Sequence, residues 1–203
     1  MDDLVEEVVG IAGRDLALLR PRDAESLLSE EAFDQDEFLP YWAELWPSSL
    51  ALARFIGARA LKGRRCVELG CGLGLPSLAA AVAGGRVTAT DWAPEATAMT
   101  VANANRNGLT VEGLTVSWTE PDQLIARAPW DLVLASDVLY EARNAEALLP
   151  LLPRLIDDKG EIWLADPGRT AAAPFLERAA EVFTIERRAA PEIPQGAVYR
   201  LRV

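Results

Sequence analysis

The sequence contains no histidine among its 203 residues. This absence excludes Ser-His-Asp and Cys-His hydrolases, the usual zinc enzymes and histidine general-base catalysis. The two cysteines, Cys66 and Cys71, have a spacing that suits neither a disulfide framework nor a metal site. We therefore expect no bound metal, and any chemistry must depend on carboxylates, tyrosine, backbone dipoles or a cofactor.

Long apolar runs and an excess of positive charge are also missing. The longest apolar run, residues 75–83, is interrupted by Pro76 and Ser77 and is too short to cross a bilayer. The first seven residues are acidic where a secretory signal would be basic. A net charge of −11 argues against a nucleic-acid partner. We expect a cytoplasmic protein that binds a protein or small-molecule partner and no membrane; the sequence leaves the oligomeric state open.

The chain is long enough for one domain with an N-terminal appendage. Apolar residues between positions 2 and 20 are spaced as on one face of a helix: Leu4, Val5, Val8, Ile11 and Leu16. Residues 21–46 are irregular, and Pro47 opens a predicted helix that continues to about residue 61. We divide the chain into an N-terminal helix with an irregular cap segment, 1–40, and a single domain, 41–203.

Strands and helices alternate from residue 64 onward. The predicted strands are 65–69, 86–91, 114–118, 130–136 and 160–166, and the predicted helices are 75–84, 94–107, 121–127 and 143–157. This alternation is typical of a parallel sheet with right-handed crossovers. After a helix near 171–181, runs at 182–188 and 197–203 predict an antiparallel pair. The expected fold is an α/β Rossmann-like three-layer sandwich of about seven strands, mainly parallel with an antiparallel last strand.

A glycine loop follows the first strand of this pattern. Its spacing is Glu-x-Gly-x-Gly-x-Gly, with Glu68 ahead of Gly70, Gly72 and Gly74. A nicotinamide fingerprint would need a glycine where Leu75 stands. The loop with its acidic residue instead favours a ligand with a positively charged amino-acid end and no pyrophosphate. The alternative is a plain turn between strand and helix that binds no ligand.

Further candidates stand at the ends of the following strands. Asp91 lies about twenty residues beyond the loop, where Rossmann-like folds place the acid that binds ribose hydroxyls. It is alternatively a cap for the next helix. Trp118 and Ser136 are predicted to end the third and fourth strands and so to reach the same crevice. The Trp118 indole is a candidate for packing on an adenine, with a place in the core as the alternative.

Three segments, 68–76, 88–91 and 131–140, together resemble the seven-β-strand (class I) S-adenosylmethionine-dependent methyltransferases. The Trp-Ala-Glu-Leu-Trp-Pro-Ser run at 42–48 and the Asp-x-x-Tyr at 137–140 resemble the protein-lysine methyltransferase branch. The Ala-Asp-Pro-Gly-Arg run at 165–169 is similar to bacterial relatives of the electron-transfer-flavoprotein lysine methyltransferase. The resemblance covers about residues 40–203.

The resemblance implies S-adenosylmethionine as cofactor and S-adenosylhomocysteine as product. It implies that Glu68, Gly70 and Gly72 hold the methionine end, that Asp91 binds the ribose, and that three residues frame the adenosine: Trp46, Trp118 and Ser136. Asp137 and Tyr140 would face the acceptor amine. Asp137 would orient the amine or accept a proton late; the alternative is an N-cap of the 143–157 helix. Tyr140 would offer its ring or hydroxyl, or merely pack at the edge of the pocket.

The resemblance favours methyl transfer to a lysine side chain of a protein. A small-molecule N- or O-methyltransferase is the alternative, because the family fixes the cofactor better than the acceptor. A cofactor-binding module without turnover is a third hypothesis, and the acid at 137 weighs against it. Trp42 and Glu44 are candidates for a lid, with a purely structural role for Trp42 as the alternative.

Overall fold

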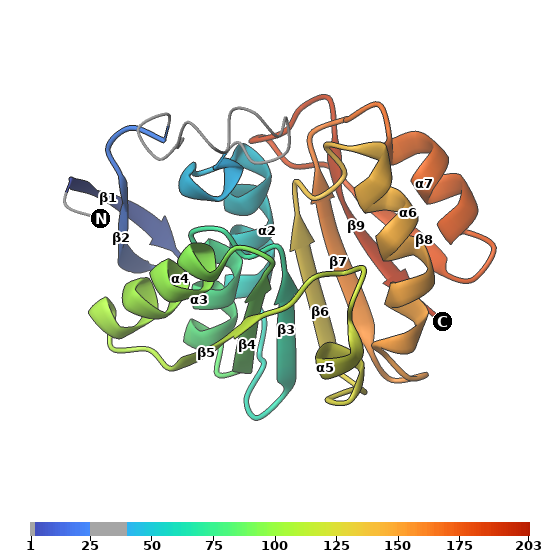
Figure 1. The fold of residues 1–203 in the computed structure, drawn as a ribbon, viewed down its shortest axis with the longest axis horizontal. Coiled ribbons are helices and arrows are strands. Elements are labelled where there is room, and N and C mark those ends of the chain that lie inside the picture. Colours follow the sequence, from blue (N-terminus) through green and yellow to red (C-terminus); the bar gives the residue numbers. More distant parts are fainter. Residues whose placement is uncertain (1–2, 25–39) are drawn as a thin grey trace.

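The computed structural model describes residues 3–24 and 40–203, and its centre is a seven-stranded sheet (Figure 1). The strands are β3 (Arg65–Leu69), β4 (Arg86–Asp91), β5 (Val111–Thr115), β6 (Leu132–Ser136), β7 (Glu161–Asp166), β8 (Thr184–Arg188) and β9 (Ala197–Arg202). Their order across the sheet is β5-β4-β3-β6-β7-β9-β8. Only β9 runs antiparallel to its neighbours β7 and β8. The expected fold, with its antiparallel last strand, is confirmed.

Helices cover both faces of the sheet and complete three layers (Figure 1). They are α2 (Pro47–Gly57), α3 (Leu75–Val82), α4 (Pro94–Arg106), α5 (Asp122–Ile125), α6 (Ala142–Leu151) and α7 (Ala172–Ala179). The first three pack on one face, and α5, α6 and α7 pack on the other. Successive residues of β6 alternate between the two cores: Leu132 and Leu134 face the first, Val133 and Ala135 the second. No described helix has the length and apolarity that a membrane crossing requires.

The third strand was predicted too late in the sequence. It covers Val111–Thr115 and not 114–118, because its parallel ladder with β4 ends where Thr115 faces Asp91. The apolar alternation continues past this point through buried Val116, which made the strand look longer. Trp118 therefore lies in the loop after β5 and not at a strand end.

The N-terminal prediction of a helix was wrong: the segment is a β-hairpin. β1 (Leu4–Ile11) and β2 (Arg14–Pro21) pair antiparallel around Ala12 and Gly13, whose φ angles of 51° and 78° are those of a tight type I′ turn. The buried positions alternate with the period of a strand, whereas Val8, which the helical pattern required, is 61% exposed. The hairpin contributes four buried residues to the domain core: Val9, Ile11, Leu16 and Leu18.

Asn103 of α4 and Asn107, the C-cap of the same helix, fasten the hairpin to the domain. The Asn107 side chain accepts from the Ala17 N–H and donates to the Ala17 C=O, at 2.9 and 2.8 Å. The Asn103 amide makes the same pair of bonds with Leu19, at 2.7 and 3.1 Å. The two side-chain amides thus make the hydrogen bonds to the free edge of β2 that the backbone of a further strand would make. Asn103 also donates to the C=O of Leu73, so one side chain joins the hairpin to the glycine loop.

Candidate active site

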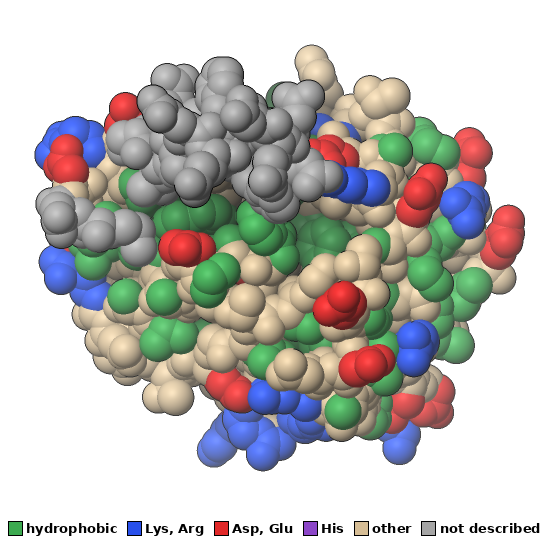
Figure 2. Space-filling view, viewed as in Figure 1, with side chains coloured by type: hydrophobic (Ala, Val, Ile, Leu, Met, Phe, Trp, Pro, Cys, Tyr) green, Lys and Arg blue, Asp and Glu red, His purple; other side chains and the backbone are tan. Residues whose placement is uncertain are grey.

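A cavity of about 670 Å³ lies at the carboxyl ends of β3, β4 and β6. The chain moves outward from β3 to β5 and then returns to β6, so the cavity occupies the point where strand order reverses. Figure 2 shows hydrophobic side chains gathered around a hollow near the centre of the view. Eight of the ten predicted site residues line the cavity: Trp46, Gly70, Gly72, Asp91, Trp118, Ser136, Asp137 and Tyr140.

The glycine loop forms one wall with its backbone. Gly72 has φ of 52°, and a Cβ there would lie 3.1 Å from the Trp42 carbonyl oxygen. Gly74 has φ of 81° and does not line the cavity, but a Cβ on it would overlap Thr100 at 2.3 Å. Gly72 thus leaves room for the segment that closes over the loop, and Gly74 lets α4 pack beneath it.

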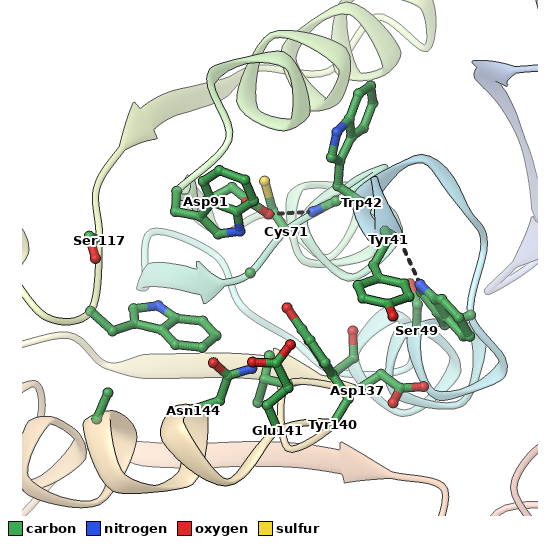
Figure 3. A pocket seen from close by; sticks show the side chains of 18 of the residues that line it. Tyr41, Trp42, Ser49, Cys71, Asp91, Ser117, Asp137, Tyr140, Glu141 and Asn144 are labelled. Atoms are coloured by element: carbon green, nitrogen blue, oxygen red, sulfur yellow. Dashed lines mark hydrogen bonds between the residues drawn. The ribbon is translucent and has the colours of Figure 1, made fainter. Parts of the chain in front are cut away.

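Asp91 fixes this wall from the end of β4. Its Oδ2 accepts from the Gly72 N–H at 3.1 Å (Figure 3). Its Oδ1 accepts from the Ala93 N–H, also at 3.1 Å. Burial raises the pKa of the carboxyl, while these backbone donors lower it. The N-cap of α4 is Ala93, which has no side-chain cap bond, so the helix-cap alternative for Asp91 is wrong. Asp91 instead bonds the backbone before α4 and also lines the cavity.

Glu68 does not line the cavity. It is fully buried under the loop, where its Oε2 accepts from the Ser77 N–H at 2.9 Å and the Ser77 hydroxyl at 2.5 Å. Burial raises the pKa of this carboxyl to about 8. Glu68 thus supports the first turn of α3, and direct contact with a ligand stays a prediction.

Three further residues, which the sequence predicts to frame an adenosine, also line the cavity. Trp118 reaches the cavity from the loop after β5, and its indole would lie 3.3 Å from a Cβ on Gly70. Ser136 lines the cavity from the last position of β6. Trp46 lines it from the N-cap of α2 and donates its indole N–H to the Tyr41 carbonyl at 2.8 Å.

Asp137 follows β6 with φ of 56°, in the left-handed region that few non-glycine residues adopt. Its Oδ1 accepts from Arg169 Nε at 2.9 Å, and its Oδ2 accepts from the Ser48 hydroxyl at 3.3 Å. The N-cap of α6 is Glu141, so the helix-cap alternative for Asp137 is wrong. A strained, buried acid on a cavity wall is a feature of functional sites.

Arg169 is a cavity residue that the sequence did not single out by itself. The Oδ1 of Asp166 accepts from the N–H groups of Gly168 and Arg169, at 2.7 and 2.8 Å, and folds the loop after β7 back toward the cavity. The guanidinium then lies 5.6 Å from the centre of the Trp46 ring. The sequence did contain an indication of this turn. Residues 166–169 read Asp-Pro-Gly-Arg directly after a predicted strand, and this composition is typical of a tight turn.

An aromatic pair borders the other side of the cavity. Tyr140, 39% exposed, lies 5.2 Å from the ring of Tyr41 with an interplanar angle of 58° (Figure 3). Burial raises the pKa of the Tyr140 hydroxyl. Tyr41 was not predicted, although it stands directly before the quoted Trp-Ala-Glu-Leu-Trp-Pro-Ser run. Figure 3 shows Asp91 on one side of the cavity and Asp137 with Tyr140 on the other.

Comparison with known proteins identifies this arrangement. Residues 33–181 match the model of a family described as "Lysine methyltransferase". The chain belongs to this family. The predicted resemblance to protein-lysine methyltransferases is thereby confirmed.

Similar curated proteins carry several acceptor names. The electron transfer flavoprotein beta subunit lysine methyltransferase of Xenopus laevis is 34% identical over 136 residues, covering 64% of this chain and 53% of that protein. EEF1A lysine methyltransferase 3 of Mus musculus is 32% identical over 168 residues, covering 79% and 72%. The human histone-arginine methyltransferase METTL23 is 31% identical, covering 63% and 71%. The chain spans about half the length of the first relatives it matches.

Solved structures agree on the fold. The 16S rRNA N2 G1207 methyltransferase RsmC of T. Thermophilus, in complex with AdoMet and guanosine, superposes with a TM-score of 0.72 at 18% identity. It covers the whole of this chain and 51% of its own. A putative methyltransferase, SMU.776, complexed with SAH, gives a TM-score of 0.70 at 10% identity, covering 98% and 56%.

Proposed function

We propose that this protein is an S-adenosylmethionine-dependent methyltransferase that methylates a lysine side chain of a protein. One observation carries the proposal: a single cavity has a glycine-loop wall with a buried acid and, opposite, a wall of tyrosines and an acid. Membership of the lysine methyltransferase family supports it. The non-catalytic alternative would not require the strained Asp137 on the second wall.

The residues present fit the cofactor. A cavity of about 670 Å³ lies within the range of small-molecule sites. We assign the ribose hydroxyls to Asp91, the methionine end to the loop from Gly70 to Gly72, and the adenosine to the surfaces of Trp46, Trp118 and Ser136. Glu68 and Gly74 support the loop from below. When bound, S-adenosylmethionine supplies an activated methyl group on a sulfonium, so this chain needs only to position an acceptor.

The acceptor is assigned to the second wall. Tyr41 and Tyr140 present rings on which the aliphatic part of a lysine side chain can pack. Asp137 lines the same region and has lone pairs beyond those that Arg169 and Ser48 use, so it can orient an amine N–H. Burial raises the pKa of the Tyr140 hydroxyl, so the group stays uncharged at neutral pH. Its oxygen can accept a hydrogen bond from the amine N–H and leave the amine lone pair free.

The remaining assignments are also proposals. Residues 41–203 form the methyltransferase domain, and residues 1–40 are an N-terminal segment whose hairpin packs on it. A cytoplasmic location follows from the composition. Most of the segment between the hairpin and Pro40 lies outside the described residues, so its part in acceptor binding rests on the sequence alone. Trp42 and Glu44 line the cavity, and the Trp42 backbone lies against Gly72, which supports a lid role for both. The second candidate function is a small-molecule N- or O-methyltransferase.

The test is incubation of the protein with methyl-labelled S-adenosylmethionine and a cell extract, followed by separation of the label by molecular size. Label on a discrete protein band, stable to base, is the expected result. Amino-acid analysis of that band then separates methyllysine from methylarginine. Label in the small-molecule fraction alone would replace the lysine proposal with the second candidate, and the absence of any transfer would contradict both.

A further inference from the structure

The ion pair between Arg169 and Asp137 is unexpected beside a proposed amine site. Arg169 Nε lies 2.9 Å from Asp137 Oδ1, and the Ser48 hydroxyl occupies the other oxygen. The Asp137 side chain is only 5% exposed, while that of Arg169 is 37% exposed. A cation therefore already stands on the acid that would otherwise meet the acceptor.

This arrangement bears on a general difficulty of amine methylation. A new bond forms between the amine nitrogen and the methyl carbon as the sulfur–carbon bond breaks, so the nitrogen must carry a free lone pair. The acceptor ammonium must first release its proton to water. Lysine has an ordinary pKa of about 10.4, and an unpaired carboxylate nearby would raise that pKa further. A bare acid at this position would bind the unreactive form.

We propose that Arg169 cancels the negative charge of Asp137 so that the cavity binds the acceptor amine as the free base. Asp137 keeps a lone pair to orient the amine, and Arg169 is a positioning residue that acts through it. Asp166 fixes the backbone of this turn by accepting from the Gly168 and Arg169 N–H groups, and the guanidinium lies over the Trp46 ring. This inference rests on the proposed function and specifies the form in which its substrate binds.

The other charged groups around the pair do not replace Arg169. Glu44 and Glu141 also line the cavity, and Glu141 forms an ion pair with Arg143. Asp166 is buried behind the wall, outside the cavity lining. Asp91 stands on the opposite wall, held by backbone donors. Loss of the Arg169 charge would therefore leave Asp137 with the Ser48 hydroxyl but without the cation that pairs with it here.

The first measurement needs neither cofactor nor turnover. n-Butylamine, a fragment of the lysine side chain, is titrated into the full-length protein at pH 7, where it is a cation, and binding is followed by nuclear magnetic resonance. We expect R169Q and R169M to bind the probe about tenfold more tightly than the wild type, corresponding to roughly one pH unit of preference for the cation. R169M keeps the packing on Trp46. R169K should match the wild type, and R188Q, a charge loss remote from the cavity, is the control. Equal affinities in all five proteins overturn the inference.

The second measurement is the pH dependence of methyl transfer to the protein band labelled in the extract experiment. The rising limb of the rate should move upward by about one pH unit in R169Q and R169M and stay in place in R169K. Coincident profiles, in an enzyme that does label protein, overturn this inference alone. A wild type that labels no protein contradicts the proposed function, and the butylamine result then still decides whether Arg169 sets the charge of the site. Calorimetry with S-adenosylhomocysteine checks that each variant keeps its cofactor affinity.

Discussion

The two walls of the cavity are built in different ways. The glycine-loop wall consists of backbone held by buried groups: Asp91 and Glu68 bond the loop and the helix after it, and Asn103 ties it to the hairpin. The opposite wall consists of side chains that extend from loops, and its tyrosines are more than a third exposed. Amino-acid substitutions change a wall of backbone atoms little, whereas each substitution in a wall of side chains changes the surface that an acceptor meets. This difference agrees with relatives of this chain that are named for lysine and for arginine acceptors.

The largest effect should come from blocking the backbone wall. We expect Gly72→Arg to abolish cofactor binding, with Kd raised at least about a thousandfold, because a side chain there meets the Trp42 carbonyl and enters the cavity. Gly108→Arg is the matched control, since its φ of 65° is similar and nothing lies within 4 Å of its Cβ position. Calorimetry with S-adenosylhomocysteine measures both. Retained binding in Gly72→Arg would remove the loop from the cofactor site.

Glu68, which lies beneath the glycine-loop wall, should make the free energy of unfolding depend on pH. The folded protein raises the pKa of Glu68 from 4.5 to about 8, so folding favours the protonated acid. The stability from this group is fully present below pH 4.5 and is lost as the pH rises through 8. Glu68→Gln should therefore be more stable than the wild type by a few kcal/mol at pH 9 and show little gain at pH 4.

Urea unfolding of the cofactor-free protein across this pH range measures the difference. Glu146→Gln, at an exposed position in the middle of α6, is the control and should follow the wild-type curve. A Glu68→Gln curve parallel to the wild type at every pH would mean that Glu68 is ionised in the folded state, as direct binding of an ammonium would require.

On the side-chain wall, Asp137→Ala should leave cofactor affinity within about threefold while turnover falls at least about a hundredfold, or roughly 3 kcal/mol of transition-state stabilisation. The variant loses the acid that orients the amine, and Arg169 loses its partner. Asp158→Ala, an exposed acid, is the control. Equal losses of cofactor binding and turnover would place Asp137 on the cofactor side and erase the division between the walls.

The sequence predicted the backbone wall better than the side-chain wall, and the reason is physical. Gly70 and Gly72 directly follow β3, and Asp91 is the last residue of β4, so their positions in the sequence predict their positions in space. Tyr41 and Arg169 reach the cavity from segments without periodicity, through turns that only the folded chain fixes. Glu68 was predicted to contact a ligand from its spacing, but spacing cannot tell a buried side chain from one that faces the cavity, and the contact stays a prediction.

The hairpin was misread for a related reason. Apolar residues at Leu4, Val8 and Ile11 satisfy a helical spacing, while the buried positions follow the period of a strand. What decides between them is the turn at Ala12-Gly13 and the pairing of β2 with Asn103 and Asn107, which lie more than eighty residues away. Local patterns do not contain a contact of that range.

The tie between the hairpin and the glycine loop gives a smaller effect. Asn103→Ala would leave the Leu19 N–H and the carbonyls of Leu19 and Leu73 without their partner, and we expect a loss of about 2 kcal/mol in the free energy of unfolding. Asn105→Ala, on the exposed face of the same helix, is the control and should change stability by less than about 0.5 kcal/mol. Denaturant unfolding measures both. Equal stabilities would mean that apolar packing alone holds the hairpin.

The smallest effect should distinguish the ring of Tyr140 from its hydroxyl. If the aromatic pair holds the aliphatic part of the acceptor, Tyr140→Phe keeps the 5.2 Å contact with Tyr41 and should change kcat/KM by less than about threefold. Tyr140→Ala removes the ring and should raise KM for the labelled protein roughly tenfold at unchanged cofactor affinity. A loss in Tyr140→Phe as large as that in Tyr140→Ala would assign the role to the hydroxyl. The wall would then act by one directed hydrogen bond and not by the shape and polarisability of its rings, and a change of acceptor would need more than an exchange of aromatic side chains.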